Sequence, residues 1–326
     1  MNPEEKFIAC VATLFIKRLR PTLDIEKSKD FEYIKNSGKS FIGWNPTASE
    51  ARGKSIWEYY KANNLPAYFV ERGALPDTVV IDPNGFLCDS SSYDEENWNF
   101  PLLNGQEQDI NQYIADLTSD ESSLEHQKSS RLNKDQFHSA VGSVNKELIF
   151  VPMQLETDTV IERWSDWVKG VKQFFKIVEQ LADAFPDKVF MVKPHPLTHL
   201  KFDTQNNVIN VDSLHYKDCL AYCDKVLLIN SGLGLQALAW GKPVIIVGKA
   251  WYNFEGMNYK ATDFNNTIDL LYADLPVDME KAKRFLYFLK FVLYSDCIQT
   301  KHINSSHINR TDDAEYTNIR IFKGRE

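Results

Sequence analysis

The stretch from Lys188 to Gly256 constrains the fold of this chain more than any other. Short apolar runs alternate there with helix-like segments, in the order KVFMVKPHP, NVINVD and KVLLINSGLGLQALAWGKPVIIVG. Apolar runs of this length, separated by helical segments, are typical of a parallel β-sheet with crossover helices. The stretch therefore predicts a sheet of parallel strands in the second half of the chain.

Polar residues follow these apolar runs at the points where the predicted strands end. Lys193 and His195 follow one strand, and a second strand ends at Asn230 and Ser231. Ligands of open α/β sheets bind at this carboxyl edge. The SGLG turn at 231–234 also opens a helix, whose unpaired N–H groups suit a phosphate. We therefore predict that the second half of the chain binds a nucleotide.

The first half also alternates predicted strands with a helix. Apolar runs at 40–44, 67–73 and 78–85 indicate strands, and the residues at 55–64 place apolar side chains at helical spacing. Both halves of the chain are therefore expected to be α/β.

A polar, Ser-rich segment from about 117 to 146 separates the two patterns and indicates a connection between domains. We expect an N-terminal, acceptor-side α/β domain with this connection at 1–145. A C-terminal domain that binds a nucleotide sugar is expected at 146–326.

Composition excludes some classes of function. The chain has 326 residues and a net charge of −8, which argues against a basic surface that binds nucleic acid. It contains no apolar run of about 18 residues, so no membrane-spanning helix is predicted. Acidic residues precede the short apolar run near the N-terminus, which we interpret as a buried strand or helix and not as a signal peptide. We expect a cytoplasmic protein.

The five cysteines predict no metal site. Only Cys219 and Cys223 are close, one helical turn apart, and no second Cys/His pair completes a zinc site. We interpret them as buried, reduced thiols. The sequence also lacks an Asp-x-Asp pair at a strand end, so we predict no metal and no cofactor.

Two α/β domains with polar strand ends facing a cleft are the arrangement of GT-B glycosyltransferases. Several enzymes that transfer no sugar share this arrangement, so the fold alone does not decide the function. The predicted fold class is α/β and GT-B-like, with two Rossmann-like domains and a cleft between them.

Four segments between about 41 and 260 carry a more specific signal. In chain order they are GW (43–44) with Lys54, VERGALPDTVVIDPNGF (70–86), VPMQLETDTVI (151–161), and KPHP (193–196) with NSGLGLQALAWGKPVIIVGKAWYNFEG (230–256). Together they resemble the capsule polysaccharide biosynthesis proteins of Gram-negative bacteria, the family that includes the retaining β-Kdo transferases.

The resemblance implies a site for a CMP-activated sugar. The residues expected to bind the nucleotide sugar are Gln154, Lys193, His195, Pro196, Asn230, Ser231, Gly232 and Gln236. The family usually has a glutamate where this chain has Gln236, which affects donor affinity or nucleotide identity. Structural alternatives stay open at three positions: His195 as the cap of a turn, Ser231 as an ordinary helix cap, and Lys193 as a solvated charge.

The resemblance also implies two catalytic carboxylates. The family's Gln-x-x-x-Asp arrangement resembles Gln154 to Asp158, which makes Asp158 the candidate nucleophile of a retaining transfer. Its alternative is a helix cap. Glu71, expected across the cleft, is the candidate acid/base, and its alternative is an ion pair with Arg72 or Lys54. Arg72 and Lys54 are in turn candidates for holding the carboxylate of a 2-keto sugar acid.

The function implied is a glycosyltransferase of capsule, lipopolysaccharide or other surface polysaccharide biosynthesis. It moves a CMP-activated 3-deoxy-ulosonic acid, with Kdo as the leading candidate, to a polysaccharide or glycolipid acceptor with retention of configuration. We expect the reaction at the inner face of the inner membrane, with at most peripheral membrane contact. One alternative is a GT-B enzyme that uses a UDP-sugar as transferase or epimerase. Another is an inactive scaffold in a capsule-assembly complex.

Overall fold

A computed structural model of the chain describes residues 5–10, 16, 19, 22–46, 53–119, 130–142, 145–202, 204, 207–299, 314–322 and 324. Two compact units divide the chain. Unit 1 combines Met1–Phe100 with Phe285–Glu326, and unit 2 is the continuous stretch Pro101–Arg284. The sequence of unit 2 is therefore inserted into that of unit 1.

These units differ from the predicted domains 1–145 and 146–326 at both ends of unit 2. The helices α4 (Asn104–Ser119) and α5 (Lys134–Val141) belong to unit 2, where α5 packs against α8 (Tyr216–Tyr222). The last described strands of the chain belong instead to the sheet of unit 1. Both assignments depend on contacts between residues far apart in the sequence, which leave no local pattern.

In the part of the chain that the structure describes, the sheet of unit 2 has six strands, and all of its pairings are parallel. The strands are β6 (Glu147–Pro152), β7 (Lys188–Lys193), β8 (Val208–Asn210), β9 (Lys225–Leu228), β10 (Val244–Ile246) and β11 (Tyr259–Lys260). Their spatial order is β8-β7-β6-β9-β10-β11, the order of the Rossmann sheet. The predicted parallel sheet is confirmed. Its strand order reverses between β6 and β9, where such sheets bind their ligands.

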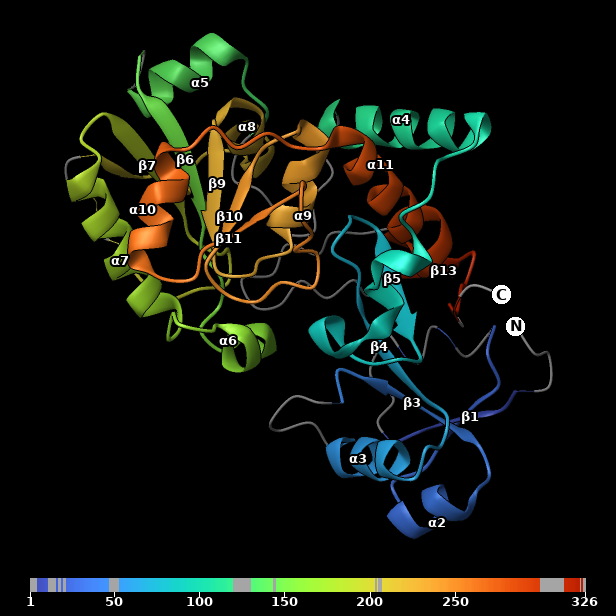
Figure 1. Cartoon of the computed structure of the whole chain (residues 1–326). Coiled ribbons are helices and arrows are strands. Elements are labelled where there is room, and N and C mark those ends of the chain that lie inside the picture. The colour runs from blue at the N-terminus through green and yellow to red at the C-terminus, as the bar shows by residue number, and fades with distance from the viewer. Residues whose placement is uncertain are drawn as a thin grey trace. The chain divides into compact units, whose positions relative to one another are not determined.

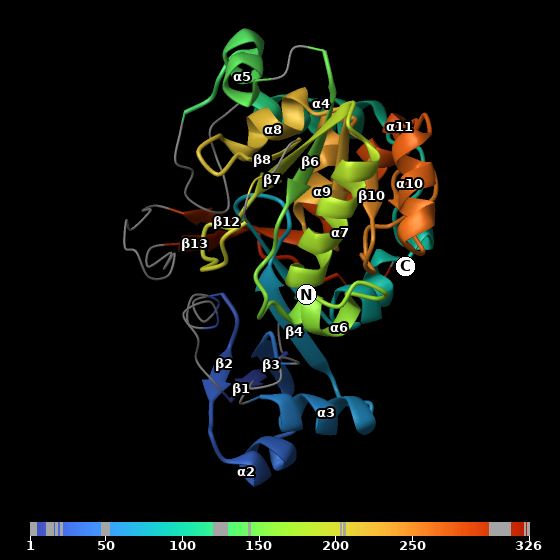
Figure 2. The same cartoon turned by 90° about the vertical axis from the view of Figure 1, so that its left-hand side faces the viewer.

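Helices cover both faces of this sheet (Figure 1). Besides α8 they are α6 (Thr159–Trp164), α7 (Val171–Ala184), α9 (Leu233–Ala237), the 3-10 helix η4 (Leu238–Trp240) and α10 (Phe264–Tyr272). One apolar cluster joins α6, α7 and α10 to alternate strand residues such as Ile149 and Val151. Leu148 and Phe150 are equally buried and point to the other face, where α8 contacts β6 and α9 contacts β9. Figure 2 shows α7 lying along its face of the sheet.

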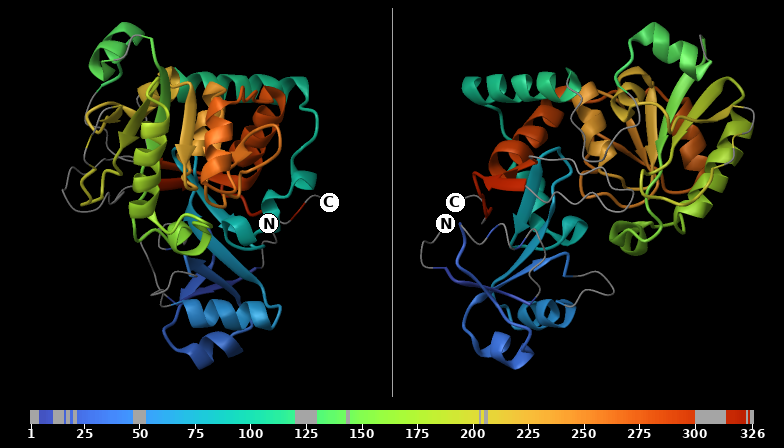
Figure 3. Two further views of the ribbon diagram at one scale, coloured as in Figure 1. Left: turned by 60° about the vertical axis from the view of Figure 1, so that its left-hand side comes forward. Right: turned by 180° about the vertical axis from the view of Figure 1, so that it is seen from behind.

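Unit 1 contains a mixed sheet with the order β13-β12-β5-β4-β3-β1-β2. Its strands are β1 (Phe7–Ala9), β2 (Ile25–Lys27), β3 (Ser40–Trp44), β4 (Ala67–Arg72), β5 (Thr78–Asp82), β12 (Tyr294–Gln299) and β13 (Ala314–Thr317). The helix α3 (Lys54–Ala62) packs on β3 and β4, and α2 (Phe31–Asn36) lies beside α3 (Figure 3). Three short 3-10 helices follow β5: η1 (Leu87–Asp89), η2 (Ser91–Tyr93) and η3 (Glu95–Asn97). The chain re-enters unit 1 through α11 (Met279–Tyr287) and the π-helix η5 (Phe288–Leu293).

The strands β4 and β5 run antiparallel. Only residues 73–77 connect them, which is too short for a parallel crossover. Gly73 permits the close turn, because a Cβ at this position would lie 2.0 Å from Oγ1 of Thr78. On its other side β5 pairs antiparallel with β12, so the returning chain extends the sheet of unit 1.

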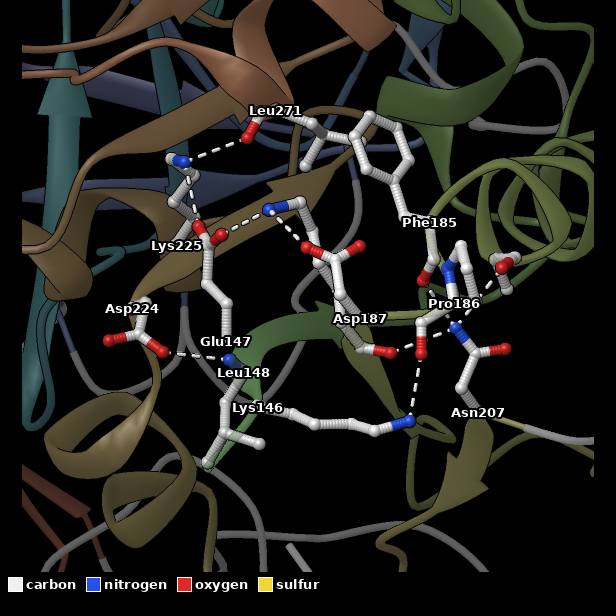
Figure 4. Close-up of polar contacts among 12 residues, drawn as sticks. Lys146, Glu147, Leu148, Phe185, Pro186, Asp187, Asn207, Asp224, Lys225 and Leu271 are labelled. Atoms are coloured by element: carbon white, nitrogen blue, oxygen red, sulfur yellow. Dashed lines mark hydrogen bonds and ion pairs between the residues drawn. The ribbon is translucent and has the colours of Figure 1, made fainter. Parts of the chain in front are cut away.

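Charged side chains are buried at the amino-terminal edge of the unit 2 sheet (Figure 4). Glu147 of β6 accepts hydrogen bonds from Lys188 of β7 and from Lys225 of β9, the latter at 2.7 Å. The two lysine side chains are only 6% and 10% exposed. Burial opposes the ionisation of Glu147, but the hydrogen bonds from both lysines outweigh it and lower the pKa of this carboxyl group. The Glu147 carboxylate thus pairs with two buried ammonium groups and joins three neighbouring strands, and Nζ of Lys188 also lies 3.9 Å from Oδ2 of Asp187.

Replacing Glu147 by glutamine is expected to lower the free energy of unfolding by about 3–5 kcal/mol, because two buried lysines lose the carboxylate that they share. The pKa of Glu147 in the folded chain lies below its ordinary value of 4.5. The stabilisation is therefore fully present at neutral pH and is lost as the pH falls below about 4.5. Chemical denaturation of both proteins at about pH 7 and about pH 4 measures the difference, which should shrink at the lower pH.

The matched control for this change is Glu280→Gln. Glu280 is 67% exposed and forms an ion pair with Lys283 at 3.3 Å. Exposed pairs of this kind contribute about 0–1 kcal/mol. Equal effects of the two substitutions would contradict the role assigned to Glu147.

Candidate functional site

The carboxyl ends of β6 and β9 meet at the switch point of the sheet, and side chains from the two loops bond to each other. Nε2 of Gln154 donates to Oδ1 of Asn230 at 2.9 Å, and the Asn230 backbone N–H donates to Oε1 of Gln154 at 3.2 Å. Both residues are more than nine-tenths buried. Nδ2 of Asn230 also donates to the carbonyls of Val160 and Trp164, at 3.0 and 3.1 Å. These two residues thus bond within the fold, and their contact with a nucleotide sugar stays a prediction.

Asp158 begins the helix α6 on the loop that leaves β6. Its Oδ1 accepts a hydrogen bond from the backbone N–H of Val160 at 3.2 Å. The side chain is half-buried, and the carbonyl of Val160 is bound by Asn230 from the neighbouring strand end. The structure confirms the helix cap that the sequence left open, and it brings the segment of Asp158 to the switch point. The role of Asp158 as nucleophile stays a prediction.

The turn that begins at Ser231 follows β9 directly. Oγ of Ser231 accepts a hydrogen bond from the backbone N–H of Leu233 at 3.3 Å, whereas the cap position of α9 is Gly232, which has no side chain to cap the helix. The buried hydroxyl of Tyr252 donates to the Ser231 carbonyl. Gly234 makes room for this ring, because a Cβ there would lie 2.4 Å from the Tyr252 hydroxyl. Gly232 lies between Ser231 and the first residue of α9.

Gln236 is buried on α9 and is oriented by a tyrosine that the sequence analysis did not single out. The hydroxyl of Tyr216 donates to Oε1 of Gln236 at 3.0 Å, and the Tyr216 ring stacks on the ring of His215. The two bonded residues are 20 positions apart, so no local pattern marks the contact. The contact of Gln236 with the nucleotide sugar stays a prediction.

The loop after β7 contains the remaining predicted nucleotide-binding residues. Nζ of Lys193 is buried and donates to three carbonyls within 211–214, at distances of 2.6 to 3.5 Å. Lys193 therefore holds the connection between β8 and α8, and it is not a solvated charge. Nδ1 of His195 accepts a hydrogen bond from the backbone N–H of Leu197 at 3.1 Å, which confirms the turn cap considered for His195. His195 is half-buried and Pro196 is exposed. Contact of these residues with CMP stays a prediction.

The other candidate residues belong to unit 1. Glu71 is half-buried near the carboxyl end of β4, and its Oε1 accepts a hydrogen bond from the backbone N–H of Arg72 at 2.9 Å. Arg72 is exposed at the last position of β4. Lys54 is exposed at the first position of α3. The acid/base role of Glu71 and the binding of a sugar carboxylate by Arg72 and Lys54 stay predictions.

The described residues include no group of three or more His, Cys, Asp or Glu side chains arranged to hold a metal ion. Cys219 and Cys223 are buried free thiols, as predicted, and burial raises the pKa of Cys223 to about 12. Among the helices described, none is long and apolar enough to cross a bilayer.

Comparison with known sequences decides the family. Residues 103–269, just over half of the chain, match the family described as capsule polysaccharide biosynthesis protein. The chain belongs to this capsule polysaccharide biosynthesis family. The resemblance inferred from the four sequence segments is thereby confirmed. The chain is also 28% identical over 233 residues to protein FixF of Sinorhizobium fredii, a match that covers 68% of this chain. It spans about half, 52%, of the length of FixF.

Two solved structures show the fold of this capsule-family chain. They are described as the β-Kdo 2,7 transferase and the β-Kdo 2,4 transferase of Thermosulfurimonas dismutans KpsC, with TM-scores of 0.60 and 0.65. Each comparison covers 90% of this chain and 92% of the other. Sequence identities are 17% and 13%, so the likeness is one of fold. It confirms the predicted GT-B-like α/β fold class.

Proposed function

We propose that this capsule-family chain is a retaining glycosyltransferase. Its donor is a CMP-activated 3-deoxy-ulosonic acid, with Kdo as the first sugar to test, and its acceptor is a polysaccharide or glycolipid. We expect the reaction at the inner face of the inner membrane, which the enzyme reaches through its acceptor. The observation that carries the proposal is the position of Asp158, a half-buried carboxylate on a helix bonded to the switch point of a Rossmann sheet. Family membership and the KpsC-like fold support the same reading.

The proposed reaction has two displacements. A carboxylate oxygen of Asp158 attacks the anomeric carbon of the donor, and the bond from this carbon to the phosphate oxygen of CMP breaks. CMP leaves with the electron pair, and the sugar is held as an ester of Asp158. An acceptor hydroxyl then attacks the same carbon, Glu71 takes the hydroxyl proton, and the Asp158 carboxylate is released. Two inversions at one carbon give net retention.

Nucleotide binding is assigned to the loops after β7 and β9. Imidazole of His195 is able to donate to a phosphate oxygen, and Ser231 with Gly232 lies at the switch point, where the Rossmann order places ligands. Arg72 and Lys54 are proposed to hold the sugar carboxylate. Gln236 has an amide where the family usually has a carboxylate. Its contact with the nucleotide, or with the residues around the nucleotide, is therefore made by a neutral group.

Thermal-shift measurements with CMP, CDP and UDP test the donor class. A ligand at about 100 times its Kd stabilises the native state by about 2.7 kcal/mol, which raises the melting temperature by several degrees. We expect this shift with CMP and a smaller one with UDP. His195→Ala should weaken the CMP response, whereas replacing the exposed His199 four residues on should leave it unchanged. A shift with UDP and none with CMP would favour the UDP-sugar alternative and refute the proposed donor.

A further inference from the structure

The buried amides of Gln154 and Asn230 form a closed pair at the switch point. Each residue donates one hydrogen bond to the other, which fixes how both amide groups are turned. Burial of a polar side chain is costly unless its hydrogen bonds are satisfied, and this pair satisfies them across two strands. The orientation matters because it directs both N–H groups of the Asn230 amide away from Gln154 and toward α6.

The side-chain amide of Asn230 bonds to both ends of the helix α6. Its Nδ2 bonds the carbonyl of Val160, in the first turn, and the carbonyl of Trp164, the last residue of the helix. The Trp164 carbonyl accepts a second hydrogen bond from the backbone N–H of Lys249, at 2.8 Å, on the loop after β10. A helix of six residues has little stability of its own, so bonds of this kind determine where α6 lies.

We infer that Gln154 and Asn230 are positioning residues for the carboxylate of Asp158. Asp158 caps α6, so an amide that fixes α6 on the ends of β6 and β9 also fixes the position of the Asp158 carboxylate. This role requires no direct contact with the ligand, because both amide hydrogens of Asn230 already have carbonyl acceptors. The inference rests on the proposed function of Asp158.

Asn230→Asp is the primary test. The new side chain keeps the shape of asparagine and still accepts from Gln154, but it donates nothing to Val160 or Trp164. A displacement of about 1 Å at a reacting group can lower a rate about 100-fold. We expect the rate of CMP release from CMP-Kdo to fall by about that factor, while the Kd for CMP changes less than about 3-fold. Hydrogen exchange of the backbone amides in α6 should become faster.

The chain offers a matched control in Asn207. This residue is also buried in unit 2, and its Nδ2 donates to the carbonyls of Ala182, Phe185 and Lys188 at 2.8 to 3.1 Å. It lies at the opposite, amino-terminal edge of the sheet (Figure 4). Asn207→Asp should destabilise the fold to a similar extent but leave the rate of CMP release unchanged.

Gln154→Met keeps the test decisive where Asn230→Asp fails to fold. Methionine has nearly the same shape and leaves Asn230 bonded to α6, so a loss of about 10-fold in the rate is expected, again without a change in the Kd for CMP. Wild-type rates in both site variants would overturn the inference. So would equal losses in Asn230→Asp and Asn207→Asp, or a weakened Kd for CMP at an unchanged rate.

Failure of the proposed function gives a different result. In that case the wild-type chain releases no CMP from CMP-Kdo, and hydrogen exchange alone decides the positioning of α6. Unchanged exchange in α6 of Asn230→Asp would then overturn the positioning role as well.

Discussion

Replacing Asp158 by asparagine is expected to lower the rate of sugar transfer by about 10³-fold or more, while CMP still binds. Asparagine is as good a helix cap as aspartate, so the hydrogen bond from Val160 and the position of α6 should survive. The amide cannot form the sugar ester that the proposed first displacement requires. The loss should therefore appear in the chemical step and not in binding or folding.

Mass spectrometry and calorimetry separate these effects. With CMP-Kdo, the wild-type protein should show a sugar adduct on Asp158, and Asp158→Asn should show none. The Kd for CMP should stay within about 3-fold of the wild-type value. Asp158→Ala should show the same kinetic loss plus about 1 kcal/mol of destabilisation from the missing cap.

A matched control exists in the same unit. Asp263 caps α10 by accepting a hydrogen bond from the N–H of Asn266 at 2.9 Å. Asp263→Asn should transfer sugar at the wild-type rate. Normal transfer by Asp158→Asn, or an adduct on another residue, would refute the assignment of the nucleophile.

The second large effect is expected at Glu71. Replacing it by glutamine should slow transfer to the acceptor by about 10²–10⁴-fold, because the acceptor hydroxyl loses its general base. The glutamine keeps an oxygen that can accept from the N–H of Arg72, so β4 should end as it does now. Release of the first CMP needs no base, and the sugar adduct on Asp158 should therefore accumulate in this variant.

Rapid-quench mass spectrometry of Glu71→Gln measures the adduct over time. Glu58, exposed on α3 of the same unit, is the control, and its replacement by glutamine should change neither the adduct nor the transfer rate. Transfer by Glu71→Gln at the wild-type rate, with no build-up of adduct, would assign the base to another residue.

The parallel sheet of unit 2 was predictable because local patterns determine it. Each apolar run marks a strand, and the polar residues that follow it lie at one edge once the strands are parallel. This reasoning placed His195 and Ser231 after the ends of two strands, where the structure has them. The exact start of a helix was harder to predict where glycine or turn residues precede it. The helix α7 begins only at Val171, because Asp166 and Gly170 adopt φ angles of 62° and 84°.

The sequence pattern could not predict contacts between residues that are far apart in the chain. In the sequence, Lys193 is a charged residue that follows a strand. Its hydrogen-bond partners are carbonyls 18 to 21 positions away. The side-chain amide of Asn230 likewise bonds carbonyls 66 and 70 positions earlier, and no local pattern marks these contacts. The antiparallel turn at Gly73 and the return of β12 to the first sheet likewise depend on pairing and not on periodicity.

The insertion of unit 2 into unit 1 has a consequence for biosynthesis. The sheet of unit 1 needs β12 beside β5, and the residues of these two strands are separated by the whole of unit 2. While the nascent chain is growing on the ribosome, unit 2 has all of its strands available before β12 has been made. A premature stop codon after residue 284 would thus spare every strand of the Rossmann sheet and leave β5 as an open edge. Such an uncovered edge invites pairing with other chains, so the shortened product would be prone to aggregation.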